Sequence, residues 1–279
     1  MLKYELLPKQ LQYEGTCNSE NFFEPEKASD RDVLLTHTSE YLRALKSNQI
    51  PEKEQRKVGF PWSQQLVERE LIIAQGTITG SLYALDHGIA MNIAGGTHHA
   101  FSNRGEAFCM LNDQAIAANY LIKQLKVKKI LILDLDVHQG NGTAEIFSTT
   151  QEVFTFSMHG QANYPFKKEH SDWDIALEKG IGDSAYLSQL QSSLEQLLPQ
   201  VQPDFVFYLS GVDVLASDKL GTLGLSMAGC RQRDIMVFNW CKANGIPVQC
   251  SMGGGYSPDI RIIVEAHANT YRAAQEIFF

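Results

Sequence analysis

An aliphatic segment that ends in acidic and imidazole side chains is the feature that most constrains the fold of this chain. The run Ile-Leu-Ile-Leu at residues 130–133 follows two lysines, a pattern typical of a strand buried on both faces at the centre of a parallel sheet. With a side-chain period of two, Asp134, Asp136 and His138 would share one face of that strand. Two glycines follow and end the strand, so these side chains would lie at its carboxyl end, where open α/β sheets bind ligands. A solvated acidic turn is the alternative, but three such residues after an aliphatic strand favour a metal site.

Two adjacent histidines form a second candidate site. His98 and His99 follow a short predicted strand at residues 89–93 and two glycines. Two imidazoles side by side need partners for up to four ring nitrogens, so such a pair is uncommon in a structural core. We therefore interpret the pair as functional, with a packing role as the alternative.

Strands and helices alternate along the chain. Five strands are predicted near residues 90, 130, 154, 205 and 247, and the main helices over residues 63–86, 114–126, 185–198, 227–243 and from about 258. This order predicts an α/β fold in which a single parallel sheet is sandwiched by helices. The first thirty residues show no clear period and are predicted to form loops with at most one short helix. Every candidate motif follows a strand, which predicts one shared site at one edge of the sheet.

Composition narrows the class of protein. A chain of 279 residues with 44% hydrophobic residues can bury one sizeable core, so we expect a single domain over residues 1–279. The net charge is −8 without a basic cluster, which argues against direct nucleic-acid binding. Five widely spaced cysteines without a C-x-x-C pair are typical of reduced thiols in a cytoplasmic protein. No apolar run approaches the roughly 18 residues that span a bilayer, so no membrane association is expected.

A third buried strand, at residues 204–209, also leads to an acid, Asp213. Together Asp136, His138 and Asp213 would offer a divalent ion three N and O ligands and leave positions open, as in catalytic zinc sites. Zinc there would activate water and polarise a carbonyl oxygen. One of the two histidines could transfer the proton, and Tyr256, on a glycine-rich loop, could donate a hydrogen bond to an oxyanion. A plain turn is the alternative reading of that loop.

Five ordered blocks of the sequence resemble the zinc-dependent histone deacetylase family, most closely its class IV branch and bacterial histone deacetylase-like proteins. They are residues 95–99, 108–113, 134–142, 211–213 and 253–256. The resemblance extends over nearly the whole chain from about residue 30. It implies the arginase/deacetylase fold, one catalytic domain, one Zn2+ per chain, and hydrolysis of the amide of acetyl-lysine or a related acylated amine.

The resemblance also implies a role for each residue of the site. Zinc would be bound by Asp136, His138 and Asp213, and Tyr256 would polarise the substrate carbonyl. His98 and His99 would be the tandem active-site pair, with His99 as the general base, Asp134 behind His98 and Asn141 behind His99. Many relatives carry aspartate at the position of Asn141. A neutral amide raises the pKa of an imidazole less than a carboxylate does, which favours a neutral base.

Further positions follow from the same resemblance. Phe108 and Tyr164 would form aromatic walls of the acyl-lysine channel, together with Gly254. A monovalent cation, K+ or Na+, would lie beside the zinc, bound by Asp134 and Ser157 and by backbone carbonyls of Asp136, His138 and Met158. A second cation site would fall near Phe147, Thr150, Val153 and Tyr186.

Two other functions are compatible with the same fold. A Mn-dependent ureohydrolase of the same fold would need a further carboxylate at the position of Gly140. A non-catalytic acyl-lysine reader would be indicated by a lost ligand, base or tyrosine, and all are present.

Relatives usually begin with a further strand, so the amino end is expected to be short and an edge strand absent. The natural substrate, the acyl length and the oligomeric state are left open by the sequence.

Overall fold

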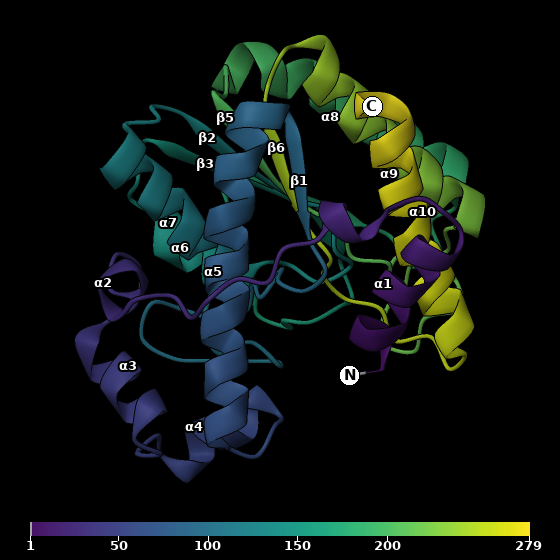
Figure 1. The fold of residues 1–279 in the computed structure, drawn as a ribbon. Coiled ribbons are helices and arrows are strands. Elements are labelled where there is room, and N and C mark those ends of the chain that lie inside the picture. Colours follow the sequence, from purple (N-terminus) through teal and green to yellow (C-terminus); the bar gives the residue numbers. More distant parts are fainter. Residues whose placement is uncertain (1) are drawn as a thin grey trace.

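Six parallel strands form one sheet in this computed structural model, which describes residues 2–279 (Figure 1). The strands are β1 (Ile89–Asn92), β2 (Ile130–Asp134), β3 (Val153–Gly160), β4 (Trp173–Leu177), β5 (Phe205–Leu209) and β6 (Val248–Ser251). Their order across the sheet is β1-β6-β5-β2-β3-β4, and every neighbouring pair is parallel. The α/β class and the single parallel sheet predicted from the alternating pattern are confirmed.

Helices cover both faces of this sheet (Figure 1). They are α1 (Lys3–Tyr13), α2 (Asp30–Val33), α3 (Ser39–Lys46), α4 (Glu52–Val58), α5 (Gln64–His87), α6 (Asp113–Tyr120), α7 (Asn141–Phe147), α8 (Asp183–Val201), α9 (Met227–Ala243) and α10 (Ile260–Phe278). The core of one face contains residues of α5 and α6, and that of the other contains residues of α8, α9 and α10. Within residues 2–279, no helix is long and apolar enough to cross a membrane.

Strand β2 lies inside the sheet, between β5 and β3, and all five of its residues are buried. Ile130 and Ile132 belong to the core on the α5 side, while Leu131 and Leu133 belong to the core on the α8 side. Successive side chains of a strand point to opposite faces, so an uninterrupted aliphatic run satisfies both cores at once. The prediction of a strand buried on both faces is confirmed.

The sixth strand, β4, was not predicted. It lies between the strand predicted near residue 154 and the helix predicted over residues 185–198, and it pairs with β3 at the edge of the sheet. An edge strand packs on fewer neighbours, and four of the five residues of β4 remain at least partly accessible. It therefore needs no aliphatic run that a sequence pattern could reveal.

The amino end also differs from its prediction. Helix α1 occupies 11 residues, longer than the one short helix expected there. Leu7 and Leu11 are fully buried and pack with Val264, Ala268 and Tyr271 of α10. Two apolar positions four residues apart are enough to dock one face of a helix, but they give a weak periodic signal.

Candidate metal centre and active site

The carboxyl ends of four neighbouring strands meet at one edge of the sheet. In the register of the sheet, Asp134 at the end of β2 is opposite Leu209 at the end of β5, and Leu209 is opposite Ser251 at the end of β6. Ser251 in turn is opposite Asn92, the last residue of β1. The polar segments that follow these strands are therefore brought together, although they are far apart in the sequence.

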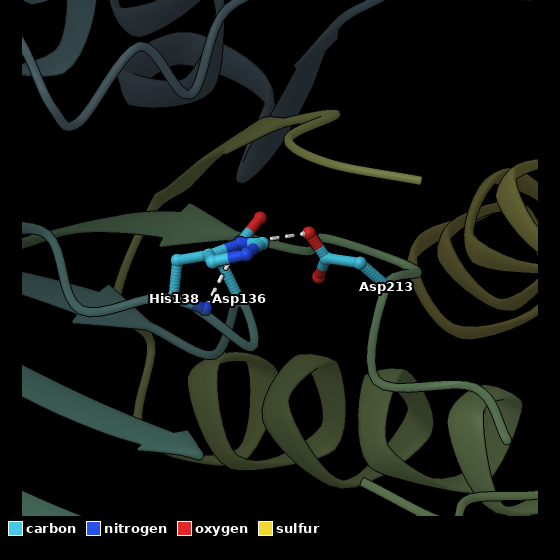
Figure 2. A group of neighbouring side chains, drawn as sticks. All are labelled: Asp136, His138 and Asp213. Carbon is cyan, nitrogen blue, oxygen red and sulfur yellow. Dashed lines mark hydrogen bonds and ion pairs between the residues drawn. The ribbon is translucent and has the colours of Figure 1, made fainter. Parts of the chain in front are cut away.

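Asp136, His138 and Asp213 form a compact group of possible metal ligands (Figure 2). One ligand atom from each residue lies within 4.8 Å of the others. The Nδ1 atom of His138 is 3.1 Å from Asp136 Oδ1 and 3.3 Å from Asp213 Oδ2. Apart from this ion pair with His138, the buried Asp213 Oδ2 makes no hydrogen bond among the described residues. A buried carboxylate oxygen without a hydrogen bond is costly, and a bound cation would satisfy it. The donor set therefore fits a divalent ion of the zinc type.

Turns built by the aspartates themselves give this group its shape. Strand β2 ends at Asp134. The prediction that strand alternation continues to His138 is therefore wrong. Instead, Asp134 Oδ1 accepts a hydrogen bond from the backbone N–H of Asp136 at 3.1 Å, and Asp136 Oδ1 accepts one from that of His138 at 3.0 Å. Aspartate favours such turns because its side chain reaches the amide two residues ahead. Asp213 Oδ1 accepts from Val137 N at 3.1 Å and joins the two loops.

Gly254, predicted as a channel residue, lies against both carboxylates of the group. Its N–H donates to Asp136 Oδ2 at 2.9 Å. A Cβ atom at this position would lie 1.9 Å from Asp213 Oδ2, so no side chain can be accommodated there. Gly254 is therefore required by the packing of the two aspartates.

The electrostatics of the group favour a cation. Burial by itself lowers the pKa of His138, but the two neighbouring carboxylates of Asp136 and Asp213 outweigh it and raise that pKa to about 10. Burial and repulsion by Asp136 raise the pKa of Asp213 to about 6. Two carboxylates that converge on one imidazole attract positive charge to its Nδ1 atom, whether a proton or a metal ion.

The tandem histidines are held by two different partners. His98 Nδ1 is 2.6 Å from Asp134 Oδ2, and His99 Nδ1 is 2.6 Å from Asn141 Oδ1. The centroids of the two rings are 4.1 Å apart, and the centroid of the His99 ring is 5.9 Å from that of the His138 ring. These pairings are the ones expected from the resemblance.

The pKa values of the two histidines shift in opposite directions. Burial lowers the pKa of His98, but the charge and hydrogen bond of Asp134 leave it above its ordinary value. Burial, followed by the charges of His98 and His138, holds the pKa of His99 well below its ordinary value. The amide oxygen of Asn141 can only accept, so His99 donates from Nδ1 and keeps a free lone pair on Nε2. A neutral imidazole of this kind is suited to act as a base.

Three aromatic side chains surround this group. The ring of Tyr164 meets His99 edge-on at 5.0 Å, and the ring of Phe108 is 6.2 Å from that of Tyr256. Phe108 is 41% exposed, which places it between the site and the surface. Burial and then the charges of Asp213 and Asp136 raise the pKa of Tyr256 well above its ordinary value. The phenol of Tyr256 therefore remains a hydrogen-bond donor.

Strands β2 and β3 carry residues expected at the first monovalent-cation site. Asp134 and Ser157 are opposite each other on β2 and β3, and Met158 is buried next to Ser157. Ser157 Oγ is 2.9 Å from His159 Nδ1. Of the residues expected at the second site, Phe147 and Val153 belong to the core on the α5 side, and Tyr186 belongs to the core on the α8 side. The backbone N–H of Thr150 donates a hydrogen bond to the carbonyl of Phe147.

Sequence reasoning missed two charged residues beside the site. Lys3 Nζ donates to the carbonyl of Gly253 at 3.1 Å and lies 5.7 Å from the centre of the Tyr256 ring. Burial lowers the pKa of Lys3 to about 8, although nearby carboxylates oppose this. Glu106 accepts a hydrogen bond from the Tyr164 hydroxyl at 2.7 Å. Lys3 left no sequence signal because it reaches the site from the opposite end of the chain, whereas Glu106 lies within the loop between two recognised blocks.

Comparisons with known proteins agree with this geometry. The histone deacetylase domain family matches residues 2–271. The chain is 43% identical to an uncharacterized protein of Picosynechococcus, over 100% of this chain and 93% of that protein. It is 31% identical to histone deacetylase 2 of Arabidopsis thaliana, over 97% of this chain and 72% of that protein. A histone deacetylase homologue from Aquifex aeolicus superposes with a TM-score of 0.81 and 25% identity, over 95% of this chain and 76% of that one, which confirms the expected arginase/deacetylase fold. This chain belongs to the histone deacetylase family.

Proposed function

We propose that this protein is a zinc-dependent deacylase that hydrolyses the amide of acetyl-lysine or of a related acylated amine. The observation that carries the proposal is the convergence of ligand atoms from Asp136, His138 and Asp213 within 4.8 Å of one another, with Asp213 Oδ2 buried and without a hydrogen bond among the described residues. A neutral His99 and a protonated Tyr256 lie at the same strand ends. The similarity to histone deacetylase 2 of Arabidopsis and to a probable deacetylase of Archaeoglobus fulgidus, 32% identical over 89% of this chain, also supports a deacetylase.

Each residue of the site would have a separate role in the hydrolysis of the amide. A zinc ion held by Asp136, His138 and Asp213 would supply Lewis-acid activation of water and of the substrate carbonyl. His99 would accept a proton from the attacking water at Nε2 and return it to the departing amine as the amide C–N bond breaks, while Asn141 holds the ring through Nδ1. Tyr256 would donate a hydrogen bond to the carbonyl oxygen as negative charge develops on it. Phe108 and Tyr164 would line the channel and exclude water from the bound acyl-lysine.

A ureohydrolase is disfavoured by the space around Gly140. A Cβ atom at this position would lie 2.5 Å from Asp134 Oδ2 and 3.3 Å from the His98 side chain. The carboxylate that a second metal would need therefore has no room. An acyl-lysine reader is disfavoured because the ligand group, the base and the tyrosine are all assembled.

Several finer assignments belong to the same proposal. K+ or Na+ would bind at Asp134, Ser157 and the Met158 carbonyl. The substrate would be an acyl-lysine protein or a small acylated amine, without direct nucleic-acid binding. The five cysteines are free thiols, which supports a reducing compartment such as the cytoplasm.

A matched set of substrates tests this function. An acetyl-lysine peptide, a long-chain acyl-lysine peptide and an acetylated polyamine are incubated with the metal-free and the zinc-loaded protein. We expect turnover to be lost with a chelator and restored by one zinc per chain, and the preferred substrate identifies the class. Stoichiometric zinc without turnover of any member would contradict the deacylase and favour a reader.

Exchange of Asn141 for aspartate tests the base. A carboxylate beside Nδ1 stabilises the imidazolium, so the pKa of His99 rises and the neutral base is lost at a higher pH. The acidic limb of the profile of kcat/KM against pH is therefore expected to move to higher pH in Asn141→Asp. Asn119→Asp is the control, because Asn119 bonds to Thr36 away from the site. An acidic limb that stays in place in Asn141→Asp would argue that His99 is not the base.

A further inference from the structure

A fully buried arginine connects the two loops that carry the ligand group. Arg233 lies on α9, and none of its side chain is accessible to solvent. It is the largest of the fully buried side chains among the described residues. Burial of a guanidinium costs several kcal/mol unless its charge and its donors are all satisfied. Its partners therefore show what it is retained for.

The guanidinium donates to three backbone carbonyls from two separate loops. Nη1 reaches Gly211 O at 2.6 Å and Leu135 O at 3.3 Å, and Nη2 reaches Ser210 O at 2.9 Å. Leu135 stands next to Asp136, and Gly211 stands two residues before Asp213. One planar side chain thus bonds to the backbone beside both aspartates of the ligand group.

A second set of hydrogen bonds holds the arginine itself in place. Arg233 Nε donates to Asp234 Oδ1 at 2.9 Å, so the positive charge is paired. Asp234 also accepts hydrogen bonds from the hydroxyls of Tyr208 on β5 and Thr270 on α10. Two helices and a central strand therefore fix the position of the guanidinium.

We propose that Arg233 is a positioning residue that sets the distance between the two loops and so preorganises the ligand group for zinc. This inference rests on the proposed metal centre. A buried ion pair contributes little net stability compared with apolar residues of similar volume, so stability alone is a weak reason to keep it. The rigid fork of arginine can reach three carbonyls in a fixed plane, whereas lysine offers a single point charge. The bonds to carbonyls of both loops are thus a specific use of arginine.

Zinc affinity separates this role from a purely structural one. Arg233→Lys keeps the charge and loses the fork, Arg233→Met loses both, and Thr270→Ala is a milder change that removes one bond to Asp234. Arg272→Lys is the matched control, because Arg272 pairs with Glu14 and Glu265 on the surface. For each variant, the zinc dissociation constant is measured by competition with a chromophoric chelator. The visible spectrum of the Co2+ form and the thermal unfolding of the metal-free protein are also recorded.

We expect the Arg233 variants to bind zinc about 10–100-fold more weakly and to show an altered Co2+ spectrum, the effect typical of lost partners behind metal ligands. Thr270→Ala should shift the dissociation constant in the same direction by less, and Arg272→Lys should leave constant and spectrum unchanged. An unchanged zinc constant and Co2+ spectrum in every Arg233 or Thr270 variant that folds would overturn the proposal, even if thermal stability falls. If the unsubstituted protein binds neither metal, the metal centre itself fails, and this inference fails with it.

Discussion

Replacement of Asp213 by asparagine is expected to abolish zinc binding and to reduce deacylase turnover to the level of the chelator-treated protein. The change removes the charge from Oδ2, the atom that faces His138 Nδ1 at 3.3 Å and has no hydrogen-bond partner among the described residues. An amide is a poor zinc ligand compared with a carboxylate. The amide oxygen can still accept from Val137 N, as Oδ1 does now at 3.1 Å, so the loop should keep its shape.

The measurement combines zinc content after dialysis, turnover of the best substrate and far-ultraviolet circular dichroism. Asp259→Asn serves as the control, because Asp259 caps the start of α10 outside the ligand group. The control should retain one zinc per chain and full turnover. Asp213→Asn with stoichiometric zinc and zinc-dependent turnover would show that the ligand assignment is wrong.

The parts of the fold that could be predicted are those with local signals. Helix α9 has the predicted bounds, and α5 starts after the Ser63 cap and ends before Gly88, so each of its ends lies one residue later than predicted. The Ser63 side chain accepts a hydrogen bond from the backbone N–H of Leu66, and Gly88 adopts a positive φ. Each helix boundary is therefore set by a single residue, a capping side chain at the start and a glycine without a side chain at the end. The meeting of the ligand loops was also predictable, because parallel strands in one sheet end at one edge.

What could not be predicted depends on contacts between distant segments. Lys3 reaches Gly253 from the other end of the chain, and Arg233 reaches Leu135 from α9. Each contact needs the positions of two elements, which no local pattern contains. The prediction that Asp136 and His138 continue the alternation of strand β2 was wrong for a related reason. The side chain of Asp136 accepts a hydrogen bond from the backbone N–H of His138, and this local turn replaces the extended conformation after β2 ends.

Replacement of Tyr256 by phenylalanine is expected to lower kcat by about 10²–10³-fold while one zinc per chain is retained, the loss typical of a removed oxyanion donor. Burial and nearby carboxylates keep the phenol protonated, so the loss should be equal across the working pH range and the shape of the pH profile should not change. The ring itself should stay in place, since it lies beside Phe108 and Lys3 Nζ and its backbone N–H bonds to Asp218 at 2.6 Å.

Tyr164→Phe provides the matched control, because it removes a hydroxyl from the same group of aromatic residues. That hydroxyl is bound to Glu106, so it is not free to serve the reacting carbonyl, and kcat should fall far less than in Tyr256→Phe. Zinc content and kcat are measured for both variants with the same acyl-lysine peptide. Equal losses of kcat in the two variants would mean that general disturbance of the channel, and not a lost oxyanion donor, limits turnover. A Tyr256→Phe enzyme with the original kcat would remove Tyr256 from the mechanism, and stabilisation of the oxyanion would then fall to the zinc alone.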